Sequence, residues 1–186
     1  AIVPSFFIEP GSNAAGSLQV FLDQHPDCAE LVVKPAIGAG SRDTQRHGRT
    51  RTDNASAHIN RLLDGGRSVL VQPYLDRVDE AGETALIHFD GWFSHAIRKG
   101  PLLRPDEGST TELYAAEQID PREASVEERE LAARVLAVLP FEAMPAYARV
   151  DLIRDADGHP VLLELELTEP SLFFNHAPGS AERFAT

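Results

Sequence analysis

The sequence predicts an α+β protein in which helices pack on antiparallel sheets. Stretches with strand character outnumber helical ones, and most of them follow one another directly, as strands in hairpins do. Two turn sequences, Asp90-Gly91 and Asp155-Ala156-Asp157-Gly158, each separate two strand-like stretches. Because short turns join antiparallel strands, these observations favour antiparallel pairing.

The expected strands are short apolar stretches bounded by turn residues. They span residues 31–35, 68–74, 84–89, 92–98, 147–154 and 161–167, and the apolar opening 1–8 is also strand-like. Residues 99–124 are polar and predict a long loop, of the kind that is often functional. The tail from Ser171 is left unassigned.

Three helices are expected from their end signals. The first is capped by Ser12 or Asn13 and ends near residue 25, before Pro26. The second begins at residue 53 or 54 and is closed by Gly65-Gly66. The third begins with the capping-box spacing of Ser125 and Glu128 and continues to about residue 139.

Composition and charge exclude several classes of protein. The 186 residues are 42% hydrophobic and 25% charged, which is typical of a folded domain. Acidic side chains outnumber basic ones by 29 to 17, so the net charge of −12 argues against nucleic-acid binding. Nine carboxylates lie between Asp106 and Glu130, a run that we interpret as a solvated helix face and loop. We therefore expect no nucleic-acid partner.

Membrane and disulfide signals are also missing from the sequence. No apolar run approaches the roughly 20 residues that cross a bilayer, and no signal peptide is visible. A lone cysteine, Cys28, fits a reducing compartment. We expect a cytoplasmic protein without a membrane partner.

The most informative segment is the last expected hairpin. Glu164 and Glu166 are two residues apart and therefore share one face of a strand. If residues 156–159 form the loop, Asp151 lies opposite Glu164 and Arg149 lies opposite Glu166. Three carboxylates on one face favour a cation such as Mg²⁺ or Mn²⁺, and Arg149 beside them can neutralise an anion. The alternative is an ordinary hairpin with a polar outer face.

Two further segments carry weaker signals for a nucleotide. Lys34 ends a strand and precedes the glycine-rich residues 37–44, whose backbone N–H groups can bind phosphate. The segment lacks the Gly-Lys-Ser/Thr of a P-loop, and a flexible turn is the alternative. Residues 72–75 leave another strand, where backbone groups lose their partners and an adenine edge can bind; an ordinary strand exit is the alternative. At the end of a further strand, Arg98 and Lys99 either bind an anionic substrate group or stay solvated.

Taken in order, these segments resemble the ATP-grasp ligases over nearly the whole sequence. Four motifs carry the resemblance: Val33-Lys34-Pro35 with its glycine loop, Val71-Gln72-Pro73-Tyr74-Leu75, Arg149-Val150-Asp151 and Leu163-Glu164-Leu165-Glu166. The segments 98–103 and 169–173 are similar to the subgroup near glutathione synthetase-like ligases and the O-ureido-serine cyclo-ligase of cycloserine biosynthesis. The implied fold holds the nucleotide between two α+β subdomains.

The resemblance implies a role for each candidate residue. Lys34 binds the ATP phosphates under the loop 38–44, residues 72–75 hold adenine, and Arg149 stabilises the reacting acyl group. The implied nucleotide-binding residues are Lys34, Gly38, Gly40, Ser41, Gln72, Pro73, Tyr74 and Leu75, with Glu83 or Asp76 at the ribose. The implied metal ligands are Asp151, Glu164 and Glu166, and the implied catalytic residues are Arg149, Lys99 and Arg98. Glu166 replaces the family's usual asparagine and adds a negative charge.

The resemblance also implies a domain organisation and a reaction. Residues 1–75 correspond to the first ATP-grasp subdomain, whose N-terminal part is missing from this sequence, and residues 76–186 correspond to the second. With ATP and Mg²⁺ or Mn²⁺ as cofactors, the implied enzyme joins a small-molecule carboxylate to an amine-type nitrogen, or cyclises one molecule. A homodimer is left open. The alternatives are a silent nucleotide-binding module and an acidic domain that binds divalent cations.

Overall fold

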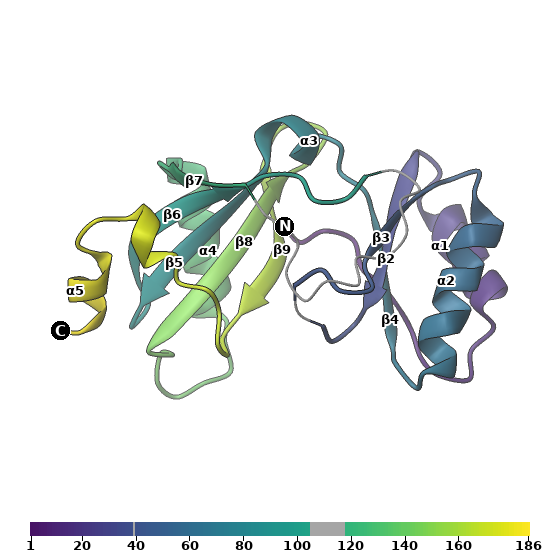
Figure 1. The fold of residues 1–186 in the computed structure, drawn as a ribbon, viewed down its shortest axis with the longest axis horizontal. Helices are drawn as coiled ribbons and strands as arrows, with labels where there is room; N and C mark the ends of the chain where they lie inside the picture. The colour runs from purple at the N-terminus through teal and green to yellow at the C-terminus, as the bar shows by residue number, and fades with distance from the viewer. Residues whose placement is uncertain (39, 105–117) are drawn as a thin grey trace. The chain divides into compact units, whose positions relative to one another are not determined.

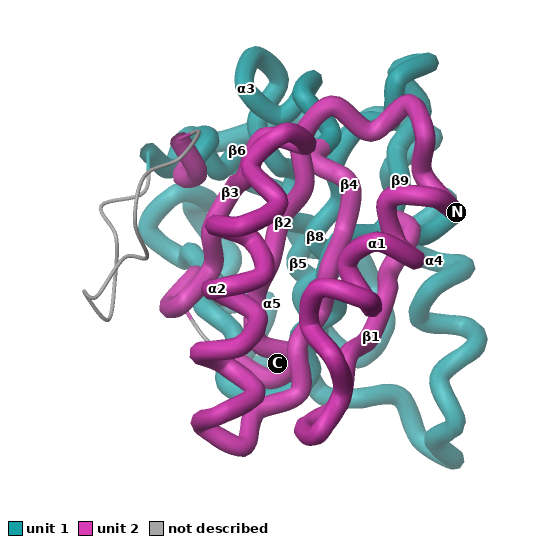
Figure 2. Tube along the Cα trace, turned by 90° about the vertical axis from the view of Figure 1, so that its right-hand side faces the viewer, with its two compact units in different colours: residues 1–2, 75–101, 117–186 teal, residues 3–74, 102–116 magenta. Residues whose placement is uncertain are grey.

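The computed structural model describes residues 1–38, 40–104 and 118–186, which form the helices and strands labelled in Figure 1. The strands are β1 (Phe6–Ile8), β2 (Glu30–Pro35), β3 (Gln45–Gly48), β4 (Val69–Pro73), β5 (Glu83–Phe89), β6 (Trp92–Lys99), β7 (Ile119–Arg122), β8 (Tyr147–Arg154) and β9 (Pro160–Glu166). The helices are α1 (Ala14–Gln24), α2 (Thr52–Asp64), α3 (Val78–Ala81), α4 (Val126–Ala137), the 3-10 turn η1 (Phe174–His176) and α5 (Ser180–Phe184). The chain divides into two compact units, one of residues 3–74 and 102–116 and one of residues 1–2, 75–101 and 117–186 (Figure 2).

The first of these units is a four-stranded antiparallel sheet with two helices on one face. The strand order is β1-β4-β2-β3. On β2, Leu31 and Val33 point into the core while Val32 and Lys34 point to the other face, as the period of two requires. Asn13 caps α1 through Gly16 N at 2.9 Å, and Leu18, Phe21, Ile59 and Leu62 from α1 and α2 fill the core. Lys34 is on the other face of the sheet, the one turned away from these helices.

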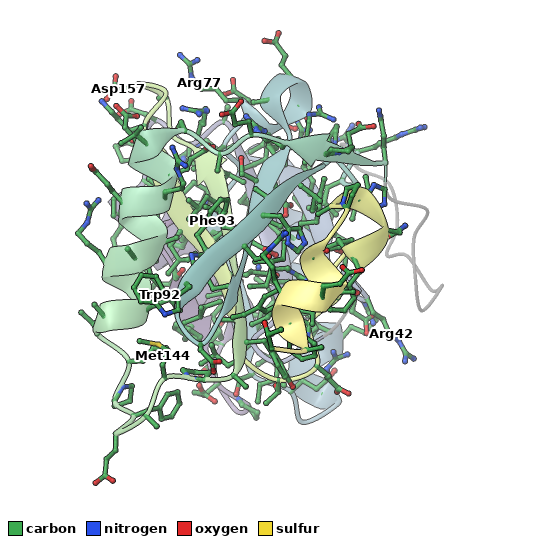
Figure 3. The ribbon with its side chains drawn as sticks, turned by 90° about the vertical axis from the view of Figure 1, so that its left-hand side faces the viewer. Arg42, Arg77, Trp92, Phe93, Met144 and Asp157 are labelled. Atoms are coloured by element: carbon green, nitrogen blue, oxygen red, sulfur yellow. The ribbon has the colours of Figure 1, made fainter. Side chains whose placement is uncertain are left out.

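The other unit is a five-stranded antiparallel sheet in the order β7-β6-β5-β8-β9. One face packs on α4 through buried Leu86, Val150, Leu131 and Leu136. The opposite face carries Ala85, Ile87 and Ile97, and residues 172–174 pack on it. At the tip of the β5–β6 hairpin, Asp90 and Gly91 both have positive φ, and Met144 lies close to Gly91; Figure 3 shows Trp92 and Met144 at this tip. In the parts of the chain that the structure describes, no helix has the length and apolar character needed to cross a bilayer.

The three predicted helices and the predicted strands form, with boundaries shifted by a few residues. Ser125 accepts from Glu128 N and the Glu128 carboxylate accepts from Ser125 N, so the predicted capping box at α4 is confirmed. Five short elements of the described residues, β3, α3, β7, η1 and α5, were not predicted. Within the expected loop 99–124, residues 119–122 form an edge strand, and residues 105–117 lie outside the described residues. Ala39, in the expected glycine loop, also lies outside them.

Candidate functional site

A β-bulge sets the register of the carboxylate hairpin. Residues 155–159 join the two strands, and Arg154 pairs with Pro160, which in a regular ladder would put Leu163 opposite Asp151. The register shift beside Asp151 leaves Leu163 as the extra residue, so Asp151 lies opposite Glu164 and Arg149 opposite Glu166, as the sequence predicted. Regular alternation would put Leu163 on the core face with Leu165 and Leu167, but beyond the bulge Leu162 packs there instead.

One oxygen from each of Asp151, Glu164 and Glu166 lies within 4.8 Å of the others, so one cation can contact all three side chains. Lys99 reaches the same face from β6, because Glu83 pairs with Lys99 and Ala85 pairs with both Ile97 and Asp151. The Lys99 Nζ atom lies 2.8 Å from Asp151 Oδ2 and 2.8 Å from Glu83 Oε2. The buried ammonium is thus held between two carboxylates.

Arg149 is the second cation of this cluster. Its Nε donates to Asp151 Oδ1 at 2.9 Å, its Nη2 donates to Asp151 Oδ2 at 2.9 Å, and Nη2 also donates to Glu166. The guanidinium lies 5.7 Å from the ring centroid of Phe173, and Nη1 donates to Ser171 O at 3.5 Å. Phe173 has a φ of +51°, a strained conformation for a residue with a side chain. The segment after β9 therefore fixes Arg149 from the side opposite the sheet.

The charges in the cluster change one another's protonation. Burial by itself raises the pKa of Asp151, but Lys99 and Arg149 outweigh it and hold that pKa below its usual range. Burial by itself lowers the pKa of Lys99, yet Asp151 and Glu83 raise it overall, so Lys99 stays charged. Burial raises the pKa of Glu83 and of Glu166.

The donor set of this cluster fits a divalent cation. With all six groups ionised, the cluster has a net charge of −2: four carboxylates carry −4, and Lys99 and Arg149 carry +2. The carboxylates are those of Glu83, Asp151, Glu164 and Glu166. Carboxylate oxygens on rigid strands are ligands that suit Mg²⁺ and Mn²⁺. Glu164 and Glu166 are partly exposed, whereas Asp151 is fully buried and both of its oxygens are hydrogen-bonded. A cation that contacts Asp151 therefore shares its oxygens with Lys99 and Arg149.

Not every predicted site residue joins this cluster. Arg98 points to the opposite face of β6, where its Nε and Nη2 donate to Ala81 O and Glu80 O at 2.9 and 3.0 Å. Neighbouring residues on a strand face opposite ways, which separates Arg98 from Lys99. Glu83, expected at a ribose, is bound to Lys99 instead, while Asp76 is exposed.

The predicted nucleotide residues of the other unit share one sheet face. Lys34 pairs with Leu70, and Val32 pairs with Gln72, so Lys34 and Gln72 lie on the face away from the helices. Gln72 is buried, and its Nε2 donates to Ser5 Oγ at 2.9 Å. Pro73 ends β4, and Tyr74 N donates to Glu30 O at 2.8 Å, so one backbone donor of the expected adenine segment is already used. Leu75 belongs to the chain's other unit.

The glycine loop is exposed at its glycines and is fixed at its end by ion pairs of Asp43. Gly38 and Gly40 are exposed, and Gly40 and Ser41 have φ values of +60° and +55°. At the end of the loop, Asp43 accepts from Arg61 at 3.0 Å and from Arg67 at 2.6 Å. These ion pairs hold the carboxyl-terminal end of the loop, and the glycines leave its backbone accessible.

Arg46 lies near this face, although the sequence did not single it out. It lies on β3 opposite Val32, and its guanidinium carbon is 3.6 Å from the ring centroid of Tyr74. Residues 45–48 are too polar and too short for a strand signature, so the side on which Arg46 points was not predictable.

A second acidic group lies at the β8–β9 turn, where Asp155, Asp157 and His159 come close together. Asp155 Oδ1 accepts from Asp157 N and His159 N at 3.0 and 2.8 Å, the pattern of a side chain that stabilises a turn. Arg77 Nε donates to Ala156 O at 3.0 Å, and Figure 3 shows Arg77 near Asp157. We assign this group a structural role.

Comparison with solved structures identifies the fold. The structure of the ATP-grasp ligase PsnB in complex with its minimal precursor, Mg and ADP superposes with a TM-score of 0.65 at 17% identity, over 99% of this chain and 51% of PsnB. The chain has the ATP-grasp fold. The expected α+β class with antiparallel sheets is therefore confirmed. No model of a known protein family matches the sequence.

The sequence is also similar to that of a protein of cycloserine biosynthesis. The cycloserine biosynthesis protein DcsG of Streptomyces lavendulae is 42% identical over 188 residues, which cover 99% of this chain and 62% of DcsG. The crystal structure of D-cycloserine synthetase DcsG matches with a TM-score of 0.89 and 41% identity, over 99% of this chain and 63% of that structure. This ATP-grasp chain thus spans about three fifths of the length of DcsG.

Proposed function

We propose that this ATP-grasp chain is the nucleotide-binding part of an ATP-dependent ligase that forms a C–N bond. The observation that carries the proposal is the 42% identity to DcsG over 99% of the chain. The carboxylate cluster adds chemical support, because it gathers four acids and two cations on one sheet face.

The substrate class follows from the same relationship. One relative is named a D-cycloserine synthetase, and closing such a ring is an intramolecular C–N ligation. We infer a small-molecule carboxylate or carbonyl-type substrate, with the nitrogen supplied by the same molecule or by a second amine. A cytoplasmic location and a homodimer stay predictions.

Asp151, Glu164 and Glu166 would hold Mg²⁺ or Mn²⁺. When bound, the ion supplies positive charge beside the phosphates of ATP. Lys34 would neutralise phosphate, and residues 72–75 would hold the adenine. The structure of PsnB is a complex with Mg and ADP, which supports the same ligands for this chain.

The proposed reaction has two steps. A substrate oxygen attacks the γ-phosphorus of ATP, the bond to the bridging oxygen breaks, and ADP leaves. The nitrogen nucleophile then attacks the activated carbon, loses a proton, and displaces inorganic phosphate. Arg149 and Lys99 contribute charge neutralisation, since both are buried cations beside the carboxylates, and the protein contributes positioning rather than covalent catalysis.

Substrate-dependent ADP release from the full-length protein tests this proposal. With ATP, Mg²⁺ and O-ureido-serine, we expect ADP release that Asp151→Asn and Glu164→Gln abolish and that Glu166→Asn retains. Glu9→Gln, in the other unit and bonded to Ser68, is the matched control and should release ADP at the wild-type rate. Nucleotide binding without turnover for any carboxylate substrate would instead indicate a silent nucleotide-binding module.

A further inference from the structure

Arg46 closes a ring of contacts around the end of β4. Its Nε donates to Glu30 Oε1 at 3.0 Å, and its Nη2 forms an ion pair with Glu30 Oε2. The guanidinium lies 3.6 Å from the centroid of the Tyr74 ring, and Tyr74 N donates to Glu30 O at 2.8 Å. Glu30 is therefore bound to Tyr74 through its backbone and to Arg46 through its side chain, and Arg46 is stacked on Tyr74.

The contacts of Arg46 restrict both parts of Tyr74. The backbone bond from Tyr74 to Glu30 extends the β2–β4 ladder one residue past the end of β4. The stacked guanidinium fixes the ring, because a bidentate pair with Glu30 leaves the guanidinium plane little freedom to turn. Arg46 Nη1 also donates to Leu103 O at 3.4 Å, so the segment after β6 is bound to the same side chain.

These contacts distinguish Arg46 from a phosphate-binding residue. Its side chain is 8% exposed, and all three guanidinium nitrogens have protein acceptors. Lys34, by contrast, lies on the same sheet face near the glycine loop. Arg46 is therefore placed to position neighbouring segments of the chain rather than to bind an anionic ligand.

We propose that Arg46 is a positioning residue that fixes residues 72–75 in the conformation that receives the adenine ring. The inference rests on the proposed function, because it requires that these residues hold a nucleotide base. Arg46 does not touch the base. It acts through Tyr74 and Glu30, and its loss removes the guanidinium stacked on the Tyr74 ring and the bidentate partner of the Glu30 carboxylate.

The test compares a nucleotide with its phosphate part alone. Dissociation constants of ADP, and of tripolyphosphate with Mg²⁺, are measured by calorimetry on the full-length protein. For Arg46→Met we expect the dissociation constant of ADP to rise about tenfold, and that of tripolyphosphate to change by less than about twofold. Arg46→Lys keeps the charge but not the flat, bidentate contact, so it should recover only part of the ADP affinity.

Arg49→Met is the matched control. Arg49 lies in the same unit and donates to the carbonyls of Leu22, His25 and Cys28 at 2.9, 2.7 and 3.2 Å, without contact to the Tyr74 ring. It should lower the melting temperature but leave the dissociation constant of ADP unchanged. If Arg46→Met does not fold, Tyr74→Leu removes the stacked ring alone and should weaken ADP by about threefold while sparing tripolyphosphate.

Three results would overturn the inference. The first is an unchanged ADP affinity in folded Arg46→Met, or in Tyr74→Leu if Arg46→Met does not fold. It would show that the ring of contacts does not position the base. Equal weakening of ADP and tripolyphosphate would place Arg46 at the phosphates. The third result is a wild-type protein that binds ADP no more tightly than it binds tripolyphosphate with Mg²⁺. It would show that residues 72–75 do not hold adenine, and it would contradict the proposed function as well.

Discussion

Lys99 shows how a single residue holds the carboxylate cluster together. Its ammonium lies 2.8 Å from both Asp151 and Glu83, and its side chain is 9% exposed. Without it, two acids of the sheet face would lose their shared cation. Removing one partner of a buried ion pair costs more than the pair contributes, because the remaining charge stays in a poor solvent.

We therefore expect Lys99→Met to lower the free energy of unfolding by about 3 kcal/mol. The neighbouring Arg98→Met removes hydrogen bonds to two carbonyls and a 4.0 Å ion pair with the half-exposed Asp120, and should cost about 1 kcal/mol. Added Mg²⁺ should recover more stability in Lys99→Met than in the wild type, because it replaces the missing positive charge. Denaturant unfolding of both variants checks this, and equal losses would contradict it.

A buried histidine pair makes the stability of the chain depend on pH. His47 Nε2 and His58 Nδ1 are 3.2 Å apart, and His58 Nε2 has no hydrogen-bond partner in the described residues. Burial, followed by the charges of His47 and Arg61, lowers the pKa of His58 to about 4. The unfolded chain, with a pKa near 6.5, therefore binds a proton before the folded one does.

The His58 contribution to stability is thus present above about pH 6.5 and falls as the pH drops towards 4. Between pH 7 and pH 5 we expect a loss of about 2 kcal/mol from this group. His58→Gln should show a smaller loss over the same range in denaturant titrations. Parallel pH profiles for the two proteins would refute the role of His58.

At the scale of secondary-structure elements, the sequence predicted what depends on local pattern. The capping box at α4, the Asp90-Gly91 turn and the shared face of Glu164 and Glu166 all follow from residue types at fixed spacing. The bulge at Leu163 and the edge strands β3 and β7 depend on partners elsewhere in the chain. Arg98 was grouped with Lys99 by adjacency, although alternation on a strand separates them.

The link between α3 and β5 depends on one glycine. Gly82 has φ +69° and ψ −176°, a region that only glycine adopts readily, and a Cβ there would lie 2.4 Å from the Lys99 carbonyl oxygen. Gly82→Ala should therefore cost about 3 kcal/mol of unfolding free energy. Gly66→Ala, at φ +72° with open space around it, should cost about 1 kcal/mol. Thermal unfolding of the two variants decides, and equal melting temperatures would refute the close contact.

At the scale of the whole molecule, each unit has its own core and its own part of the predicted set of site residues. Lys34, the glycine loop and residues 72–74 belong to one unit, and Lys99, Arg149 and the carboxylates belong to the other. Both parts were expected from the sequence because each rests on short motifs. The proposed function assigns both parts to one reaction, and it rests on DcsG, of which the chain spans about three fifths.

The most direct test of a shared metal–nucleotide site is thermal unfolding of the full-length protein with a non-hydrolysable ATP analogue, with Mg²⁺, and with both. A ligand at a hundredfold excess over its dissociation constant stabilises a protein by about 2.7 kcal/mol, or about 6 °C for a chain of this size. We predict a shift of that order with both ligands together, well beyond the sum of the separate shifts. No shift with any combination would contradict the ligase account and leave an acidic domain without a nucleotide.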